Sequence, residues 1–168
     1  MGMIVVGISE LICSADQDAS IVTYALGSCI GVGAHDPVRG LGGLLHFLLP
    51  DSRKDPERAI AQPASYADTG IPLLIRSMER MGADRRRMRV RLAGGARILD
   101  DSAQLEVGKR NYMAARKLLW QMGVIVEMEA VGGSVSRNLG ITVGTGEFWV
   151  QMRGSEAETG MRQTANES

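Results

Sequence analysis

Two side chains that can take part in nucleophilic chemistry lie close together between residues 21 and 50, in IVTYALGSCIGVGAHDPVRGLGGLLHFLLP. Cys29 follows a Gly-Ser pair, and His46 stands in an otherwise apolar run. A thiol that loses its proton is a strong nucleophile, and imidazole can accept that proton near neutral pH. The pattern therefore suggests a catalytic pair, although a lone cysteine or histidine of this kind is more often a buried core residue.

The pair depends on how two predicted strands meet. Residues 29–34 and 41–49 are apolar, and the segment HDPVRG between them carries the Asp-Pro and Gly that are typical of a turn. A hairpin centred between Pro37 and Val38 pairs residues whose numbers sum to 75, which sets Cys29 opposite His46. Opposed residues have Cβ atoms about 4.5–5.5 Å apart, so an imidazole nitrogen can approach a thiol.

The alternation of side chains along these strands predicts the surroundings of the pair. Cys29 shares a face with Gly31 and Gly33, which predicts free space beside the thiol for a substrate. His46 shares a face with Leu44 and Leu48. An aliphatic setting disfavours imidazolium, whereas a neighbouring thiolate favours it.

The remaining candidates point to structure more than to chemistry. Cys13 has no nearby basic partner, and His35 beside the turn is expected to be a solvated surface group. The arginines of residues 85–91 suit either an anionic partner or an exposed strand edge. Two cysteines and two histidines spread in this way make a poor metal site, and the glycine-rich segments lack dinucleotide and phosphate-loop spacing. We therefore expect no metal and no cofactor.

Composition indicates one globular domain. The chain has 168 residues, of which 45% are hydrophobic. Its 19 basic residues balance 19 acidic ones, which gives no electrostatic reason to expect nucleic acid or an anionic membrane as a partner. With two cysteines, and with neither a signal peptide nor a membrane span recognisable at the N-terminus, we expect reduced thiols and a cytoplasmic protein.

Hydrophobic periodicity predicts two main helices among several strands. One helix opens near Asp68 as N-cap and ends at Gly82, and the other spans residues 109–122. Their predicted core positions are Ile71, Leu74, Ile75, Met78 and Met81 in the first, and Met113, Leu118, Leu119 and Met122 in the second. Further strands are predicted at residues 3–8, 20–26, 88–95, 124–131, 139–144 and 147–152. The predicted fold class is α/β, a compact single-domain sandwich with a mixed β-sheet over residues 1–153, followed by a polar, disordered tail at 154–168.

Several segments together resemble the CheD family of chemoreceptor glutamine deamidases. The specific part is TYALGSCIGV followed by HDPVRGLGGLLHFLLP. The segments YADTGIPLLIRSMERMGA, AGGARIL, VGKRN and VGGSVSRNLGITVGTGEFWV match later parts of the family pattern in order. The resemblance covers roughly residues 4–150.

This resemblance implies an activity and roles for three residues. Cys29 is expected to be the nucleophile, His46 the base that activates it, and Thr23 the third group, which supports the site. The implied reaction converts glutamines of methyl-accepting chemotaxis receptors to glutamate through a thioester, with release of ammonia. The implied fold is similar to that of toxin-type glutamine deamidases. Some family members also bind CheC, a phosphatase that acts on the response regulator CheY.

Two alternatives stay open at this point. One is a non-catalytic module that binds CheC or receptors, and the other is a toxin-like cysteine deamidase with a different protein target. If the chain is catalytic, the backbone N–H groups of Gly27, Ser28 and Cys29 are candidates for an oxyanion hole. The Thr23 hydroxyl is then expected to accept a hydrogen bond from the ring nitrogen of His46 that does not face the thiol.

Overall fold

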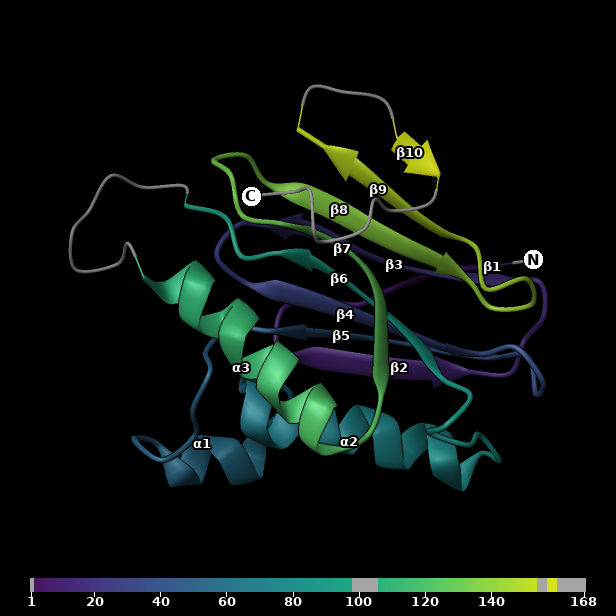
Figure 1. The fold of residues 1–168 in the computed structure, drawn as a ribbon, viewed down its shortest axis with the longest axis horizontal. Coiled ribbons are helices and arrows are strands. Elements are labelled where there is room, and N and C mark those ends of the chain that lie inside the picture. Colours follow the sequence, from purple (N-terminus) through teal and green to yellow (C-terminus); the bar gives the residue numbers. More distant parts are fainter. Residues whose placement is uncertain (1, 98–105, 154–156, 160–168) are drawn as a thin grey trace.

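The protein folds into three layers: two stacked five-stranded sheets and a layer of helices (Figure 1). The structure is a computed structural model that describes residues 2–97, 106–153 and 157–159. The helices cover the outer face of one sheet, so that this sheet is packed on both sides. The predicted α/β sandwich with few helices is confirmed, but it contains two mixed sheets where one was expected.

Each sheet mixes parallel and antiparallel pairs. The first sheet has the order β1 (Gly2–Val5), β3 (Ala19–Leu26), β8 (Arg137–Thr142), β9 (Phe148–Met152) and β10 (Ala157–Thr159), and only β1 and β3 are parallel among these described strands. The second sheet has the order β2 (Glu10–Ser14), β5 (Leu41–Phe47), β4 (Ile30–Asp36), β6 (Arg89–Gly94) and β7 (Ile125–Val131), with β6 and β7 parallel.

The helical layer consists of α1 (Pro56–Ala61), a short 3-10 turn η1 (Pro63–Ser65), α2 (Ala67–Arg80) and α3 (Val107–Gln121). The inward stripe of α2 is buried against β5 and β2, as predicted for Ile71, Leu74, Ile75 and Met78. Met81 is 38% exposed, so its predicted burial is wrong; it is the C-cap, beyond the last turn that packs on the sheet.

Asp68 does not cap α2. The helix begins at Ala67, and its N-cap is Tyr66, which makes no side-chain capping bond. The Asp68 carboxylate instead accepts hydrogen bonds from the backbone N–H and the hydroxyl of Ser52, at 3.1 and 2.9 Å. It fastens the segment before α1 to the start of α2.

The buried face of α3 differs from the predicted one. Gly108, Asn111, Ala115 and Leu119 point inward at helical spacing. Of the four predicted core positions, Leu119 is buried and Leu118 and Met122 are partly buried, but Met113 is 57% exposed. Small residues let this helix lie close to the sheet, a feature that a search for large apolar residues does not detect.

Besides the 3-10 turn η1, three elements were not predicted. The N-terminal strand ends at Val5, and after a turn with Ser9 at φ 62° the chain forms β2. Helix α1 begins at Pro56, and the Asp55 side chain accepts from the Arg58 N–H at 3.1 Å. Strand β10 pairs with β9 inside the segment expected to be a disordered tail; the rest of that tail lies outside the described residues.

The apolar layer between the sheets is tightly filled. Leu26, Leu139 and Phe148 of the first sheet pack against β4 and β5 of the second. A Cβ on Gly31 would lie 2.9 Å from Leu26 Cδ1, and one on Gly33 would lie 2.2 Å from Phe148 Cε1. The predicted free space beside these glycines is therefore wrong: side chains of the facing sheet occupy it.

Two expectations about polar residues are also corrected. His35 is only 4% exposed, and its Nε2 lies 2.8 Å from the Val143 carbonyl oxygen, so it is not a surface group. The arginine cluster forms ion pairs within the fold, at 2.8 Å between Arg85 and Glu79, 2.9 Å between Arg87 and Asp36, and 3.0 Å between Arg91 and Glu127. These contacts account for three of the arginines without an external partner.

Candidate functional site

The central contact of the site joins the two sheets. Thr23 lies on β3 of the first sheet and His46 on β5 of the second, and both side chains are buried. The Thr23 hydroxyl lies 2.7 Å from His46 Nδ1 and also 2.7 Å from the Val6 carbonyl oxygen. The structure therefore brings these two predicted site residues into direct contact.

This network determines the tautomer of His46. A threonine hydroxyl has one hydrogen to donate, and a carbonyl oxygen can only accept. The Thr23 hydrogen must therefore go to Val6, so His46 Nδ1–H must be the donor to Thr23 Oγ1. The neutral ring then carries its proton on Nδ1 and its free lone pair on Nε2. Among the described residues Nε2 is buried and has no hydrogen-bond partner.

Burial keeps this imidazole neutral. Desolvation lowers the pKa of His46 to about 4, because an apolar environment disfavours the charged ring. Of the two possibilities raised by the sequence, imidazolium beside a thiolate or neutral imidazole in an aliphatic setting, burial favours the neutral ring. A neutral Nε2 lone pair can accept a proton from a thiol or a water molecule that approaches it.

Cys29 lies on the same face as His46 but not directly opposite it. The observed register pairs Gly31 with His46 and Asp36 with Leu41, so facing numbers sum to 77 and the predicted pairing of Cys29 with His46 is wrong. Because the register differs from the predicted one by two residues, each side chain still points to its predicted face. Cys29 then lies diagonally from His46 on that face. Cys29 is in the bend before β4 and packs against the apolar layer between the sheets.

The thiol is not ionised by its surroundings. Burial raises the pKa of Cys29, and the backbone N–H of the same residue lowers it in part. No hydrogen bond within the described part of the chain joins its sulfur to His46. In free enzymes such catalytic contacts are often long and tighten when substrate binds.

The chain between Thr23 and Cys29 crosses from one sheet to the other. A β-bulge interrupts the pairing of β3 with β8 between Thr23 and Leu26. Ala25 within it has φ 58°, a strained value for a residue with a Cβ, and its N–H donates to Asn138 Oδ1 at 3.0 Å. Pairing resumes with Leu26 opposite Arg137, and residues 27–29 then lead to β4 of the second sheet.

Comparison with known proteins identifies the family. A family model described as CheD chemotactic sensory transduction matches residues 48–152. The chain is 44% identical over 158 residues to the probable chemoreceptor glutamine deamidase CheD of Solibacter usitatus, with 94% of each chain covered. The chain belongs to the CheD family. The probable deamidase CheD 1 of Syntrophus aciditrophicus is 42% identical, with 92% and 96% covered, and that of the archaeon Pyrococcus horikoshii is 38% identical, with 79% and 81% covered.

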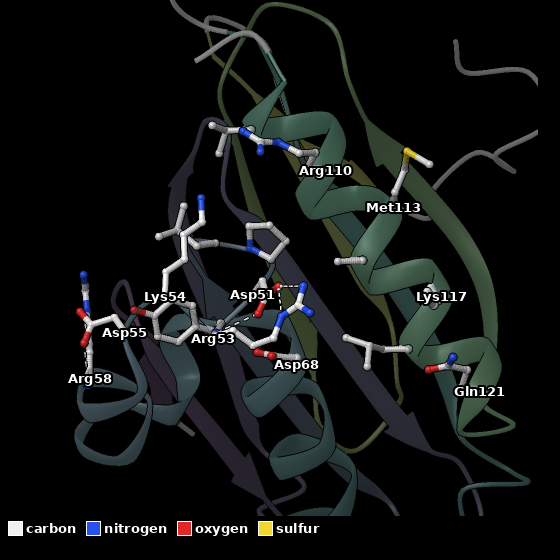
Figure 2. A pocket seen from close by; sticks show the side chains of 16 residues that line it. Asp51, Arg53, Lys54, Asp55, Arg58, Asp68, Arg110, Met113, Lys117 and Gln121 are labelled. Atoms are coloured by element: carbon white, nitrogen blue, oxygen red, sulfur yellow. Dashed lines mark hydrogen bonds and ion pairs between the residues drawn. The ribbon is translucent and has the colours of Figure 1, made fainter. Parts of the chain in front are cut away.

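A groove of about 920 Å³ lies between α3 and residues 49–68 of this CheD-family chain (Figure 2). One wall is α3, with Val107, Arg110, Met113, Ala114, Lys117, Leu118 and Gln121; the other belongs to residues 49–68. Arg53 pairs with Asp51 across a short contact, but Lys54, Arg58, Arg110 and Lys117 form no ion pair among the described residues. The exposed Met113 thus faces the groove rather than the core.

The second cysteine has no place in the site. Cys13 on β2 packs among the helix-facing apolar residues, and burial raises the pKa of its thiol to about 11. Both cysteines are free. Across the described ranges, no three His, Cys, Asp or Glu side chains gather closely enough to hold a metal ion, and no helix is long and apolar enough to cross a membrane.

Proposed function

We propose that this chain is a protein-glutamine deamidase that converts glutamines of methyl-accepting chemotaxis receptors to glutamate. The observation that carries the proposal is the buried Nε2 lone pair of His46, fixed by Thr23 and unpartnered, on the face that holds Cys29. The names of the relatives, probable chemoreceptor glutamine deamidases, support the same substrate class. In this proposal Cys29 is the nucleophile, His46 the base and Thr23 the orienting group.

The first half of the reaction forms a thioester. As the Cys29 sulfur attacks the carboxamide carbon, its proton passes to His46 Nε2, and the carbonyl oxygen becomes an oxyanion. Collapse of this intermediate breaks the carbon–nitrogen bond, and the imidazolium gives its proton to the departing ammonia. Because both resting groups are neutral, proton transfer accompanies attack and does not precede it.

The second half restores the enzyme. Water attacks the thioester while His46 Nε2 takes one of its protons. The second tetrahedral intermediate expels the Cys29 sulfur, which regains a proton from the imidazolium, and glutamate is released. The Thr23 hydroxyl accepts from Nδ1–H throughout, so Nε2 of His46 faces the reacting atoms in both halves of the reaction.

We assign the groove along α3 to the substrate segment. Deamidation adds a carboxylate to the receptor segment at each site, so the segment becomes more acidic as it is modified. The groove carries four cationic side chains without an ion-pair partner among the described residues, which suit such a segment. Its inner end is close to the site, because Leu49 in its wall follows Leu48, and Asn111 of α3 contacts both Leu48 and Ser28. The proposed occupant is an acidic helical segment of the receptor.

Two further parts of the proposal concern where the protein acts and what it binds. Two free thiols suit a reducing compartment, which supports a cytoplasmic site of action. A CheC phosphatase is proposed as a partner on the family resemblance alone. Neither requires a cofactor, nucleic acid or insertion into a membrane.

The experiment mixes purified protein with a cytoplasmic receptor fragment from the same source. Intact and peptide mass spectrometry then measure the gain of about 1 Da per site that accompanies replacement of an amide nitrogen by oxygen. Cys29→Ala is the test variant and Cys13→Ala the matched control, since it removes the other thiol.

Mass gain with the wild type and Cys13→Ala, but not with Cys29→Ala, is the expected result. Binding of the receptor without any mass gain would overturn the proposal and favour the regulatory module. Gain on glutamines of another protein, with receptors untouched, would instead indicate a toxin-like target range.

A further inference from the structure

The loop of residues 27–29 has its carbonyl groups engaged and two of its amides free. The Gly27 carbonyl accepts from the Ala96 N–H at 2.8 Å, and the Cys29 carbonyl accepts from the Gly95 N–H at 2.8 Å. Neither the Ser28 nor the Cys29 N–H donates a hydrogen bond to another described residue. Such free, adjacent amides can receive an oxyanion.

The Ser28 carbonyl is held by a side chain from a distant element. Asn111 on α3 is fully buried, and its Nδ2 lies 2.9 Å from the Ser28 oxygen and 2.8 Å from the Leu48 oxygen. Both hydrogens of this amide are therefore used. One goes to the nucleophile loop and the other to the segment two residues after His46.

A planar peptide makes this contact relevant to catalysis. In a trans peptide the C=O of one residue and the N–H of the next point in opposite directions within one plane. The chain has no cis peptide bonds among its described residues. Holding the Ser28 oxygen on the side of α3 therefore directs the Cys29 N–H away from α3.

Asn111 also carries an unpaired polar atom. Its Oδ1 is buried and accepts no hydrogen bond from the described part of the chain. A buried acceptor without a partner destabilises a fold. An apolar side chain would avoid that cost but would leave the Ser28 and Leu48 carbonyl oxygens without this donor, so the asparagine is retained for the two carbonyls that it holds.

We infer that Asn111 is a positioning residue of the deamidase: it holds the Ser28–Cys29 peptide so that the Cys29 N–H forms the oxyanion hole beside the nucleophile. This inference rests on the proposed function. Asn111 does not touch the substrate; it acts through one peptide plane and ties that plane to the strand of His46. The Ala96 N–H holds the preceding peptide, with the Ser28 N–H, in the same way.

The test separates oxyanion stabilisation from nucleophilicity. Deamidation passes through an oxyanion, whereas alkylation of the thiol by iodoacetamide is a direct displacement that needs none. For Asn111→Ala we expect kcat for receptor deamidation to fall about 100-fold with KM nearly unchanged, since loss of one oxyanion donor costs about 10²–10³ in rate. The alkylation rate of Cys29 should change by less than about threefold.

Two further variants guard against a simple loss of structure. Asn111→Leu fills a similar volume and leaves no cavity, and we expect the same fall in kcat with a nearly unchanged alkylation rate. Leu119→Ala is the matched control, because Leu119 is buried on the same helix about two turns beyond Asn111. It should lower the melting temperature but leave kcat within about twofold.

The outcomes are distinct. Near-normal kcat in both Asn111 variants would overturn the inference while leaving the deamidase intact. An equal fall in deamidation and alkylation would also overturn it, because that pattern reports a collapsed site. Lack of deamidation by the wild-type protein would overturn the proposed function itself.

Discussion

Thr23 Oγ1 and His46 Nδ1 lie 2.7 Å apart across the interface between the two sheets. The residues belong to different sheets, so their contact depends on how closely the sheets pack. Gly31, which pairs with His46, lies opposite Leu26 and Leu139 of the first sheet and makes that approach possible. The packing of the core and the orientation of the proposed base are therefore one structural feature.

Removing the Thr23 hydroxyl should impair the base without removing it. We expect Thr23→Val to lower kcat for deamidation about 10- to 100-fold, because the tautomer of His46 is no longer selected. It should also lower the free energy of unfolding by about 1–3 kcal/mol, since Val6 and His46 lose their partner. Steady-state kinetics and urea unfolding measure the two effects.

Thr23→Ser is the matched control because it retains the hydroxyl. Its kcat should stay within about threefold of the wild type. If the valine variant kept full activity, or if serine were as impaired as valine, the orienting role of the hydroxyl would be refuted.

The resting protonation state of Cys29 predicts how its reactivity depends on pH. Burial raises the pKa of this thiol and lowers that of His46 to about 4, so both groups are neutral at pH 7. The rate of iodoacetamide alkylation, measured in the Cys13→Ala background, should rise with pH through the alkaline range and show no plateau between pH 5 and 7. A preformed thiolate–imidazolium pair would instead react rapidly in that acid range.

Much of the site was accessible from the sequence, but the register was not. The types and faces of Cys29 and His46 follow from two-residue periodicity. The centre of the hairpin depends on the turn, where Asp36 accepts from the Val38 and Arg39 N–H groups and Gly40 adopts φ 64°. These contacts make a four-residue loop, and a pattern of apolar residues does not contain that information.

Asn111 was missed for a different reason. An asparagine in a helical pattern indicates a solvated face, and Met113 and Leu118 suggested that the core lay elsewhere. The inward face of α3 is made of Gly108, Asn111, Ala115 and Leu119, which only tertiary packing selects. The available signal was that Asn111 stands at helical spacing from Gly108 and Ala115, two small residues that face the sheet.

Burial of a neutral His46 predicts loss of stability in acid. The pKa of His46 in the folded protein, about 4, lies below its ordinary value of 6.5, so the unfolded chain binds protons more readily between these values. The contribution of the neutral His46 ring to the free energy of unfolding is complete above pH 6.5 and is lost as pH falls toward 4. It amounts to on the order of 3 kcal/mol over that window.

Urea unfolding at pH 7 and pH 4.5 measures this dependence. His46→Gln is the comparison, because glutamine does not titrate. The wild type should lose clearly more free energy of unfolding than His46→Gln over the same interval. Equal losses would show that His46 is not buried as a neutral ring.

Charge reversal in the groove should weaken substrate binding and leave the chemistry intact. Lys117 lines the groove in a part of α3 away from Asn111, and it forms no ion pair with the described residues. We expect Lys117→Glu to raise KM for an acidic receptor fragment several-fold at low salt, with kcat within about twofold and a smaller effect at high salt, since exposed charges are screened. Lys109→Glu is the matched control because Lys109 is exposed on the same helix but does not line the groove. Equal KM values for the two variants would show that the receptor segment binds elsewhere.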